Sequence, residues 1–211
     1  MDFAEKPKLI LPKLYLVADR KSCKLPVVDA VASSLEAGVK IIQFRDKDSS
    51  DLEFLEIAKQ IQKLCQNYNC RFLVNDRVEI AKQMDADGVH IGQSDLSIEK
   101  ARKILGNSKI LGLTVESFEE LQAANSSTAD YLGVSSIFPT PTKTDTKFYF
   151  GIVGLEKAVA ITTKPLVAIG GIQISNAAEV ANTGVDSLAF VSAVFSHENP
   201  FAKVKELLAI V

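Results

Sequence analysis

Eight short apolar segments, each followed by a stretch with helical spacing of its apolar residues, run along almost the whole chain. The apolar segments cover residues 14–17, 39–44, 72–74, 89–91, 110–114, 131–134, 166–169 and 187–191. They show no clean polar–apolar alternation, which is typical of parallel strands covered on both faces. Helices are expected over residues 27–37, 51–65, 78–84, 98–105, from Ser117 onward, and over 154–162, 175–182 and 199–210.

This alternation predicts an α/β fold, a (β/α)8 TIM barrel, as a single domain over residues 1–211. A phrase recurs where helices give way to strands: EAGVKIIQF, DADGVHIG, SSTADYLGV and NTGVDSLAF. No linker or shift in composition divides the chain. An open doubly wound sheet is the alternative, but eight evenly spaced strands and the lack of GxGxxG after the first strand favour the barrel.

Composition narrows the class of protein. The net charge of -2 gives no basic field for nucleic acid or an anionic membrane. No apolar run is long enough to span a bilayer, and the start lacks the pattern of a signal peptide. Cys23, Cys65 and Cys70 are irregularly spaced, which argues against a disulfide framework or a zinc site. We therefore expect a cytoplasmic protein with small-molecule partners; whether copies form a homo-oligomer is left open.

Two carboxylates follow neighbouring predicted strands. Asp76 comes after the third strand and Asp95 after the fourth. Because parallel strands of a βαβ unit end at the same edge, both side chains should reach one mouth. Oxygen ligands suit a hard divalent cation that also holds a phosphate. Taken singly, each Asp is better explained as a helix cap; the pair, with Asn75 and Gln93 beside it, favours a metal site.

A cationic set follows the second strand. Gln43 and Arg45 lie on one face of it, and the aromatic residue between them can pack under the helices. Both would then face the barrel mouth, where an Arg needs an anionic partner. Phosphate suits its planar fork, and Lys47 adds a point charge. An internal salt bridge from Arg45 to Asp46 or Asp76 explains the segment equally well.

Hydroxyl donors end the fifth and sixth strands. Thr114 ends the fifth strand, and a Pro- and Thr-rich loop over residues 139–150 follows the sixth. Thr140, Thr142 and Lys143 of this loop can surround an anion with several donors. The loop is long for such a connection, which indicates a lid or binding loop. A rigid surface loop is the alternative.

Glycines and a serine follow the last two strands. Gly170 and Gly171 come after the seventh strand and Ser192 after the eighth. These loops form the recurrent phosphate site of such barrels, where backbone N–H groups bind the anion. Of the two histidines, His90 is expected as a hydrogen-bonded interior residue and His197 as a surface residue. Neither histidine occurs with a Cys or Ser in the order of a known catalytic triad, so nucleophilic acyl chemistry is not supported.

Six motifs in order match a known family: QFRDK (43–47), NDR (75–77), GVHIGQSD (88–95), FPTPTK (138–143), AIGGI (168–172) and FVSAVF (190–195). With them, the chain resembles the thiamine phosphate synthase family along nearly its whole length. The resemblance implies a transferase that joins a hydroxymethylpyrimidine diphosphate to a thiazole phosphate. The products would be thiamine phosphate and pyrophosphate, and the reaction would need Mg²⁺.

The resemblance also implies roles for individual residues. The pyrimidine diphosphate would be held by Gln43, Arg45, Lys47, Asn75, Thr114 and Lys143, of which Arg45, Lys47 and Lys143 would be catalytic. Mg²⁺ would be held by Asp76 and Asp95. The thiazole phosphate would be held by Thr140, Thr142, Gly171, Val191 and Ser192. The implied mechanism is dissociative: diphosphate leaves, the aminopyrimidine ring delocalises the methylene cation, and the thiazole nitrogen attacks.

Some positions depart from the family pattern. Phe44 and Asp46 replace the more usual Leu and Glu, and Thr114 replaces Ser but keeps the hydroxyl. The segment over residues 147–150 is more aromatic than usual. Three other functions compete: a related thiazole tautomerase, a non-catalytic barrel that senses a phosphorylated thiamine precursor, and an enzyme acting on a phosphosugar. The intact diphosphate and metal residues argue against the tautomerase. The metal ligands also count against the sensor, which stays open as an alternative, and a phosphosugar enzyme explains the paired aspartates and the Thr/Lys loop less well.

Overall fold

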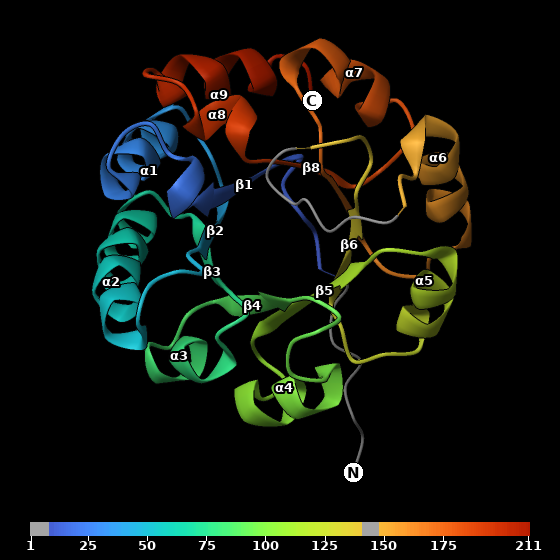
Figure 1. Ribbon diagram of the computed structural model, residues 1–211, viewed down its shortest axis with the longest axis horizontal. Coiled ribbons are helices and arrows are strands. Elements are labelled where there is room, and N and C mark those ends of the chain that lie inside the picture. Colours follow the sequence, from blue (N-terminus) through green and yellow to red (C-terminus); the bar gives the residue numbers. More distant parts are fainter. Residues whose placement is uncertain (1–8, 141–147) are drawn as a thin grey trace.

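Eight parallel strands hydrogen-bond in chain order, and β8 pairs back onto β1 to close a barrel (Figure 1). The computed structural model describes residues 9–140 and 148–211. The strands are β1 (Leu14–Asp19), β2 (Ile41–Arg45), β3 (Arg71–Asn75), β4 (Gly88–Ile91), β5 (Ile110–Val115), β6 (Tyr131–Ser135), β7 (Leu166–Ile169) and β8 (Ser187–Phe190). The predicted TIM barrel is confirmed, and the open sheet is wrong.

Helices form an outer ring around the strands (Figure 1). They are α1 (Val27–Glu36), α2 (Asp51–Asn67), α3 (Val78–Gln83), α4 (Ile98–Leu105), α5 (Phe118–Asn125), α6 (Gly151–Ile161), α7 (Ile174–Ala181), α8 (Ser192–Phe195) and α9 (Pro200–Leu208), with a 3₁₀ turn, η1 (Arg20–Ser22). None of the helices in the described ranges is long and apolar enough to cross a membrane.

Two helices differ from the sequence prediction by more than two residues at either end. The helix expected from residue 154 begins at Gly151, because Phe150 and Gly151 donate backbone hydrogen bonds to the carbonyls of Ser136 and Ile137. The chain is thus fixed to the loop after β6 before the helix starts. The short helix α8 was not expected, since its four residues are too few to show helical periodicity.

Successive side chains of β2 point to opposite faces of the sheet, as its sequence predicts. Phe44 is fully buried between barrel and helices, with its ring 4.6 Å from that of Phe54 in α2. Gln43 is buried inside the barrel, where a smaller apolar cluster includes Tyr15 and Tyr131. This interior cluster forms a floor, and the space above it opens at the carboxyl ends of the strands.

Aspartates tie neighbouring strands together at the opposite end of the barrel. Each stands just before an even-numbered strand, at the phrase that recurs in the sequence. Its carboxylate accepts a hydrogen bond of 2.7–2.9 Å from a backbone N–H of the preceding strand: Asp87 from Phe72, Asp130 from Leu111 and Asp186 from Leu166. In three of its four occurrences, the recurring phrase therefore marks where strand pairs are joined.

We expect Asp130→Ala to lower the free energy of unfolding by about 3 kcal/mol and Asp186→Ala by about 1–2 kcal/mol. Asp130 also pairs with Arg102 at 2.8 Å, and both side chains are almost buried, so its loss leaves a charge as well as an N–H without that partner. Urea unfolding measures both values, with the exposed Asp48→Ala as a control expected to stay within about 0.5 kcal/mol. Equal losses for Asp130 and Asp186 would contradict this account.

Candidate active site

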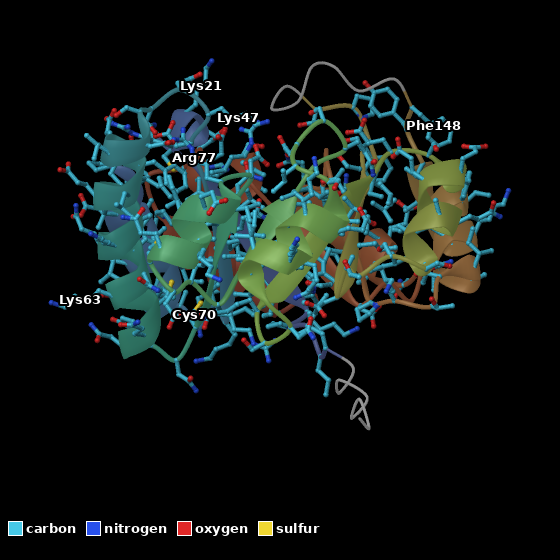
Figure 2. The ribbon with its side chains drawn as sticks, turned by 90° about the horizontal axis from the view of Figure 1, so that it is seen from below. Lys21, Lys47, Lys63, Cys70, Arg77 and Phe148 are labelled. Atoms are coloured by element: carbon cyan, nitrogen blue, oxygen red, sulfur yellow. The ribbon has the colours of Figure 1, made fainter. Side chains whose placement is uncertain are left out.

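A cavity of about 620 Å³ opens at the carboxyl ends of the strands. Lys47 and Phe148 both line it, and Figure 2 shows them on opposite sides of one end of the molecule. Cys70 and Lys63 lie toward the other end in the same view. The cavity is therefore the mouth at which the sequence analysis expected the functional side chains to meet.

The cavity brings together every predicted site residue that the structure describes. They are Gln43, Arg45, Lys47, Asn75, Asp76, Asp95, Thr114, Thr140, Gly171, Val191 and Ser192. Thr142 and Lys143 lie outside the described residues. Strand order explains the convergence, because each of these residues lies in or just after a strand whose carboxyl end forms the rim.

The paired carboxylates meet as predicted. Asp76 lies against Asp95, and its Oδ2 is 3.1 Å from Lys47 Nζ. Burial and the carboxyl group of Asp95 raise the pKa of Asp76 from 3.8 to about 6, while Lys47 opposes the shift. The helix-cap explanation is wrong for both aspartates, because α3 and α4 begin after Arg77 and Ser97, without side-chain caps.

The donor set fits a divalent cation shared with a phosphorylated ligand. Among the described residues no group of three or more His, Cys, Asp or Glu side chains is placed to hold a metal ion. A magnesium ion, however, is commonly held by one or two carboxylates, with substrate phosphates and water completing its shell. Asp76 and Asp95 supply two crowded carboxylates of this kind, whose mutual repulsion a cation would relieve.

Arg45 forms an internal salt bridge, but with a partner that the sequence analysis missed. Its Nη1 lies 2.7 Å from Asp19 Oδ1, whereas Asp46 pairs with Arg20 at 3.0 Å. Asp19 is buried at the end of β1, directly opposite Arg45 in the β1–β2 register. The Arg45 side chain stays 25% exposed within the cavity. Asp19 therefore orients Arg45 without removing it from the cavity.

Glycines allow the loops after β6 and β7 to touch. Gly170 and Gly171 have φ values of 102° and 67°. A Cβ at Gly170 would lie 1.7 Å from Ser136 Oγ, and one at Gly171 would lie 2.6 Å from the carbonyl oxygen of Pro139. Both positions thus require glycine. The close approach brings Gly171 into the same wall as Thr140 and Ser192.

The aromatic segment before α6 closes the opposite part of the rim. Phe118, Phe148 and Phe150 pack edge to face, with ring centroids 5.0–6.2 Å apart. Lys157 Nζ lies 4.4 Å from the centre of the Phe118 ring. Of these rings, Phe148 lines the cavity. The unusual aromatic residues noted in the sequence therefore anchor the start of α6 and add an apolar edge to the site.

We expect Asp76→Asn to raise the free energy of unfolding at pH 7 by about 1–2 kcal/mol. The raised folded-state pKa means that the folded protein holds this proton more tightly than the unfolded chain does. The ionised carboxyl therefore destabilises the fold fully above about pH 6, and the penalty fades as the pH falls toward 3.8. Urea unfolding at several pH values should show the gain shrinking over this window. A stability gain that grows as the pH falls would contradict the inferred repulsion between Asp76 and Asp95.

Comparison with known proteins agrees with the geometry. A family model described as thiamine monophosphate synthase matches residues 14–194. The thiamine-phosphate synthase of Vibrio parahaemolyticus is 42% identical over 198 residues, which cover 94% of this chain and 97% of that protein. The solved structure of thiamine phosphate pyrophosphorylase from Pyrococcus furiosus superposes with a TM-score of 0.86 at 41% identity, covering 94% of each chain. The chain belongs to the thiamine-phosphate synthase family.

Proposed function

We propose that this cavity joins a hydroxymethylpyrimidine diphosphate to a thiazole phosphate, forming thiamine phosphate and releasing pyrophosphate. The main support for this proposal is that two separate sets of groups suited to bind anions line one cavity. Arg45 and Lys47, with the carboxylate pair, come from the β2–β4 side, while Gly171 and Ser192 come from the β7–β8 side. Two phosphorylated substrates can thus be held at opposite sides with their organic parts between them. The family is one of transferases, and the proposal follows its reaction.

The diphosphate would lie on the β2–β4 side. Arg45, held by Asp19, offers guanidinium N–H groups, and Lys47 beside Asp76 offers an ammonium group. Asp76 and Asp95 would hold Mg²⁺, which when bound would neutralise diphosphate oxygens and make them a better leaving group. Lys143, outside the described residues, is proposed as a third cation for this end.

The thiazole phosphate would lie on the β6–β8 side. Gly171 lets an anion approach its backbone, and the Ser192 hydroxyl and Thr140 are further donors in the same wall. Val191 would contact the substrate beside them. Thr142 is proposed to add a hydroxyl. Such a site holds the second substrate by its phosphate and leaves the thiazole ring directed toward the centre of the cavity.

The reaction requires the protein to position both substrates and to neutralise the leaving diphosphate, and it requires no protein nucleophile. The bond between the methylene carbon and the diphosphate oxygen breaks, and its electron pair leaves with the diphosphate. The aminopyrimidine ring spreads the positive charge on the methylene carbon, and the thiazole nitrogen lone pair then forms the new C–N bond. Arg45 and Lys47 would stabilise the departing charge, and the two ends of the cavity would align the reacting atoms.

The cellular compartment is part of the proposal. Cys23, Cys65 and Cys70 are all free thiols, and two of them are buried. Free thiols of this kind are typical of a reducing compartment. We therefore infer that the protein works in the cytoplasm.

The direct test mixes the purified protein with both substrates and Mg²⁺ and follows pyrophosphate and thiamine phosphate. We expect equal amounts of both products and none after EDTA. Lys47→Ala should lower kcat at least tenfold, from the loss of a charged contact of about 1.5–3 kcal/mol, and Ser192→Ala should chiefly raise the KM for thiazole phosphate. Lys21→Ala, which removes an exposed lysine at the same end but outside the cavity, should leave both constants unchanged (Figure 2).

The rival functions give different results in the same assay. Isomerisation of a thiazole phosphate without the pyrimidine substrate would indicate the tautomerase. Binding of both substrates without turnover would indicate the sensor. Either result, with no thiamine phosphate formed, would overturn the proposal.

Asp19→Asn tests whether the Asp19 carboxylate orients Arg45 for catalysis. The amide keeps the shape of the side chain but loses the charge that orients the guanidinium. We expect kcat to fall about tenfold, which corresponds to about 1.4 kcal/mol of lost transition-state stabilisation, with little change in the KM for thiazole phosphate. Asp48→Asn, an exposed aspartate nearby, is the matched control. An unchanged kcat for Asp19→Asn would show that Arg45 needs no such support.

A further inference from the structure

A buried chain of hydrogen bonds crosses the floor of the cavity. Gln43 Nε2 donates to the Tyr15 hydroxyl at 2.8 Å, and that hydroxyl lies 2.8 Å from the hydroxyl of Tyr131. The Tyr131 hydroxyl lies 2.9 Å from His90 Nδ1, and His90 Nε2 lies 2.8 Å from Thr114 Oγ1. All five side chains line the cavity. The chain therefore joins two groups that face the substrate, one at each end, through three groups in the floor.

The direction of this chain follows from counting hydrogens. Each tyrosine hydroxyl carries one hydrogen, and burial raises the pKa of Tyr15 to about 12, so its hydroxyl stays protonated. When every tyrosine hydroxyl hydrogen is used within the chain, Tyr15, which accepts from Gln43, donates to Tyr131, and Tyr131 in turn donates to His90 Nδ1. His90 then carries its hydrogen on Nε2 and donates it to Thr114. The hydrogen of Thr114 is left for an acceptor in the cavity.

The reverse direction is the competing arrangement. If the Gln43 amide is turned, its oxygen accepts from Tyr15, and every later bond reverses. His90 would then carry its hydrogen on Nδ1, and Thr114 would donate to His90 and present oxygen lone pairs to the cavity. Lone pairs repel the oxygens of a diphosphate, whereas a hydroxyl hydrogen attracts them. The first direction is thus the one that suits an anionic substrate.

The barrel backbone is shaped to hold the rings that form the chain. A Cβ at Gly112 would lie 2.4 Å from His90 Nδ1 and 2.3 Å from the Tyr131 ring, and one at Gly133 would lie 3.0 Å from His90 Cε1. The His90 and Tyr131 rings stack with centroids 5.4 Å apart. Glycines on two adjacent strands therefore leave space for the histidine ring and fix where its nitrogens point.

We propose that the chain from Gln43 to Thr114 holds His90 as the neutral Nε2–H tautomer and so makes Thr114 a fixed hydrogen-bond donor to the substrate diphosphate. Tyr15, Tyr131 and His90 are positioning residues, since they act through Thr114. The identity of the acceptor rests on the proposed function, whereas the tautomer does not. Bonds in such a chain polarise one another, so a break at any link weakens the donor at its end.

The tautomer can be read directly by ¹⁵N NMR of the histidine ring nitrogens in the ¹⁵N-labelled protein. His197→Gln removes the signals of the other histidine, which lies on the surface. We expect a hydrogen on Nε2 of His90 and an unprotonated Nδ1 that accepts from Tyr131. Tyr131→Phe should remove this preference and give a mixture of tautomers. A wild-type protein with hydrogen on Nδ1 would overturn the inference, whatever the enzyme catalyses.

A double-mutant cycle tests the action through Thr114. Thr114→Val should lower kcat about tenfold and Tyr131→Phe about fivefold, the effect of one hydrogen bond in each case. The double variant should be no slower than Thr114→Val alone, and the KM for thiazole phosphate should not change. Losses that multiply to about fiftyfold would indicate independent structural damage and overturn the inference. If the wild type makes no thiamine phosphate, the proposed function fails, and the NMR result alone decides the tautomer.

Discussion

The hydrogen bonds between β8 and β1 are the contact on which the rest of the structure depends. Through them Leu14, Tyr15 and Leu16 pair with Leu188, Ala189 and Phe190, and the sheet has no edge. Because all eight strands are parallel, closure gathers their carboxyl ends into one rim. Asp19 at the end of β1 thereby stands in the same cavity as Ser192 after β8, although the two are far apart in sequence.

The cavity concentrates charge that the fold would otherwise avoid. A protein gains no stability from two partly buried carboxylates in contact, and burial together with their repulsion raises the pKa of Asp76. Lys47 offsets part of this repulsion, and on the proposed function a bound cation would relieve the rest. The opposite wall uses backbone approach at Gly171 instead of charge. On the proposed function, the two sides would thus use different chemistry for two different phosphorylated substrates.

The order of strands and helices could be predicted from sequence because hydrophobic periodicity reflects local structure. The helix expected over residues 98–105 was found with those bounds, and the predicted site residues that the structure describes line one cavity because strand ends are visible in the sequence. The pairing of Asp19 with Arg45 could not be predicted, since it depends on strand register. The hydrogen-bond chain through His90 could not be predicted either, because its residues come from five strands. The start of α6 was missed because backbone bonds to the loop after β6 determine it.

The central claim is that one cavity binds the two phosphorylated groups on opposite sides. It is tested most directly by a crystal structure with thiamine phosphate, pyrophosphate and Mg²⁺ bound. The account predicts pyrophosphate and the metal beside Arg45, Asp76 and Asp95, with the phosphate of thiamine phosphate at Gly171 and Ser192. Pyrophosphate bound on the β7–β8 side, or thiamine phosphate bound outside the cavity, would contradict it.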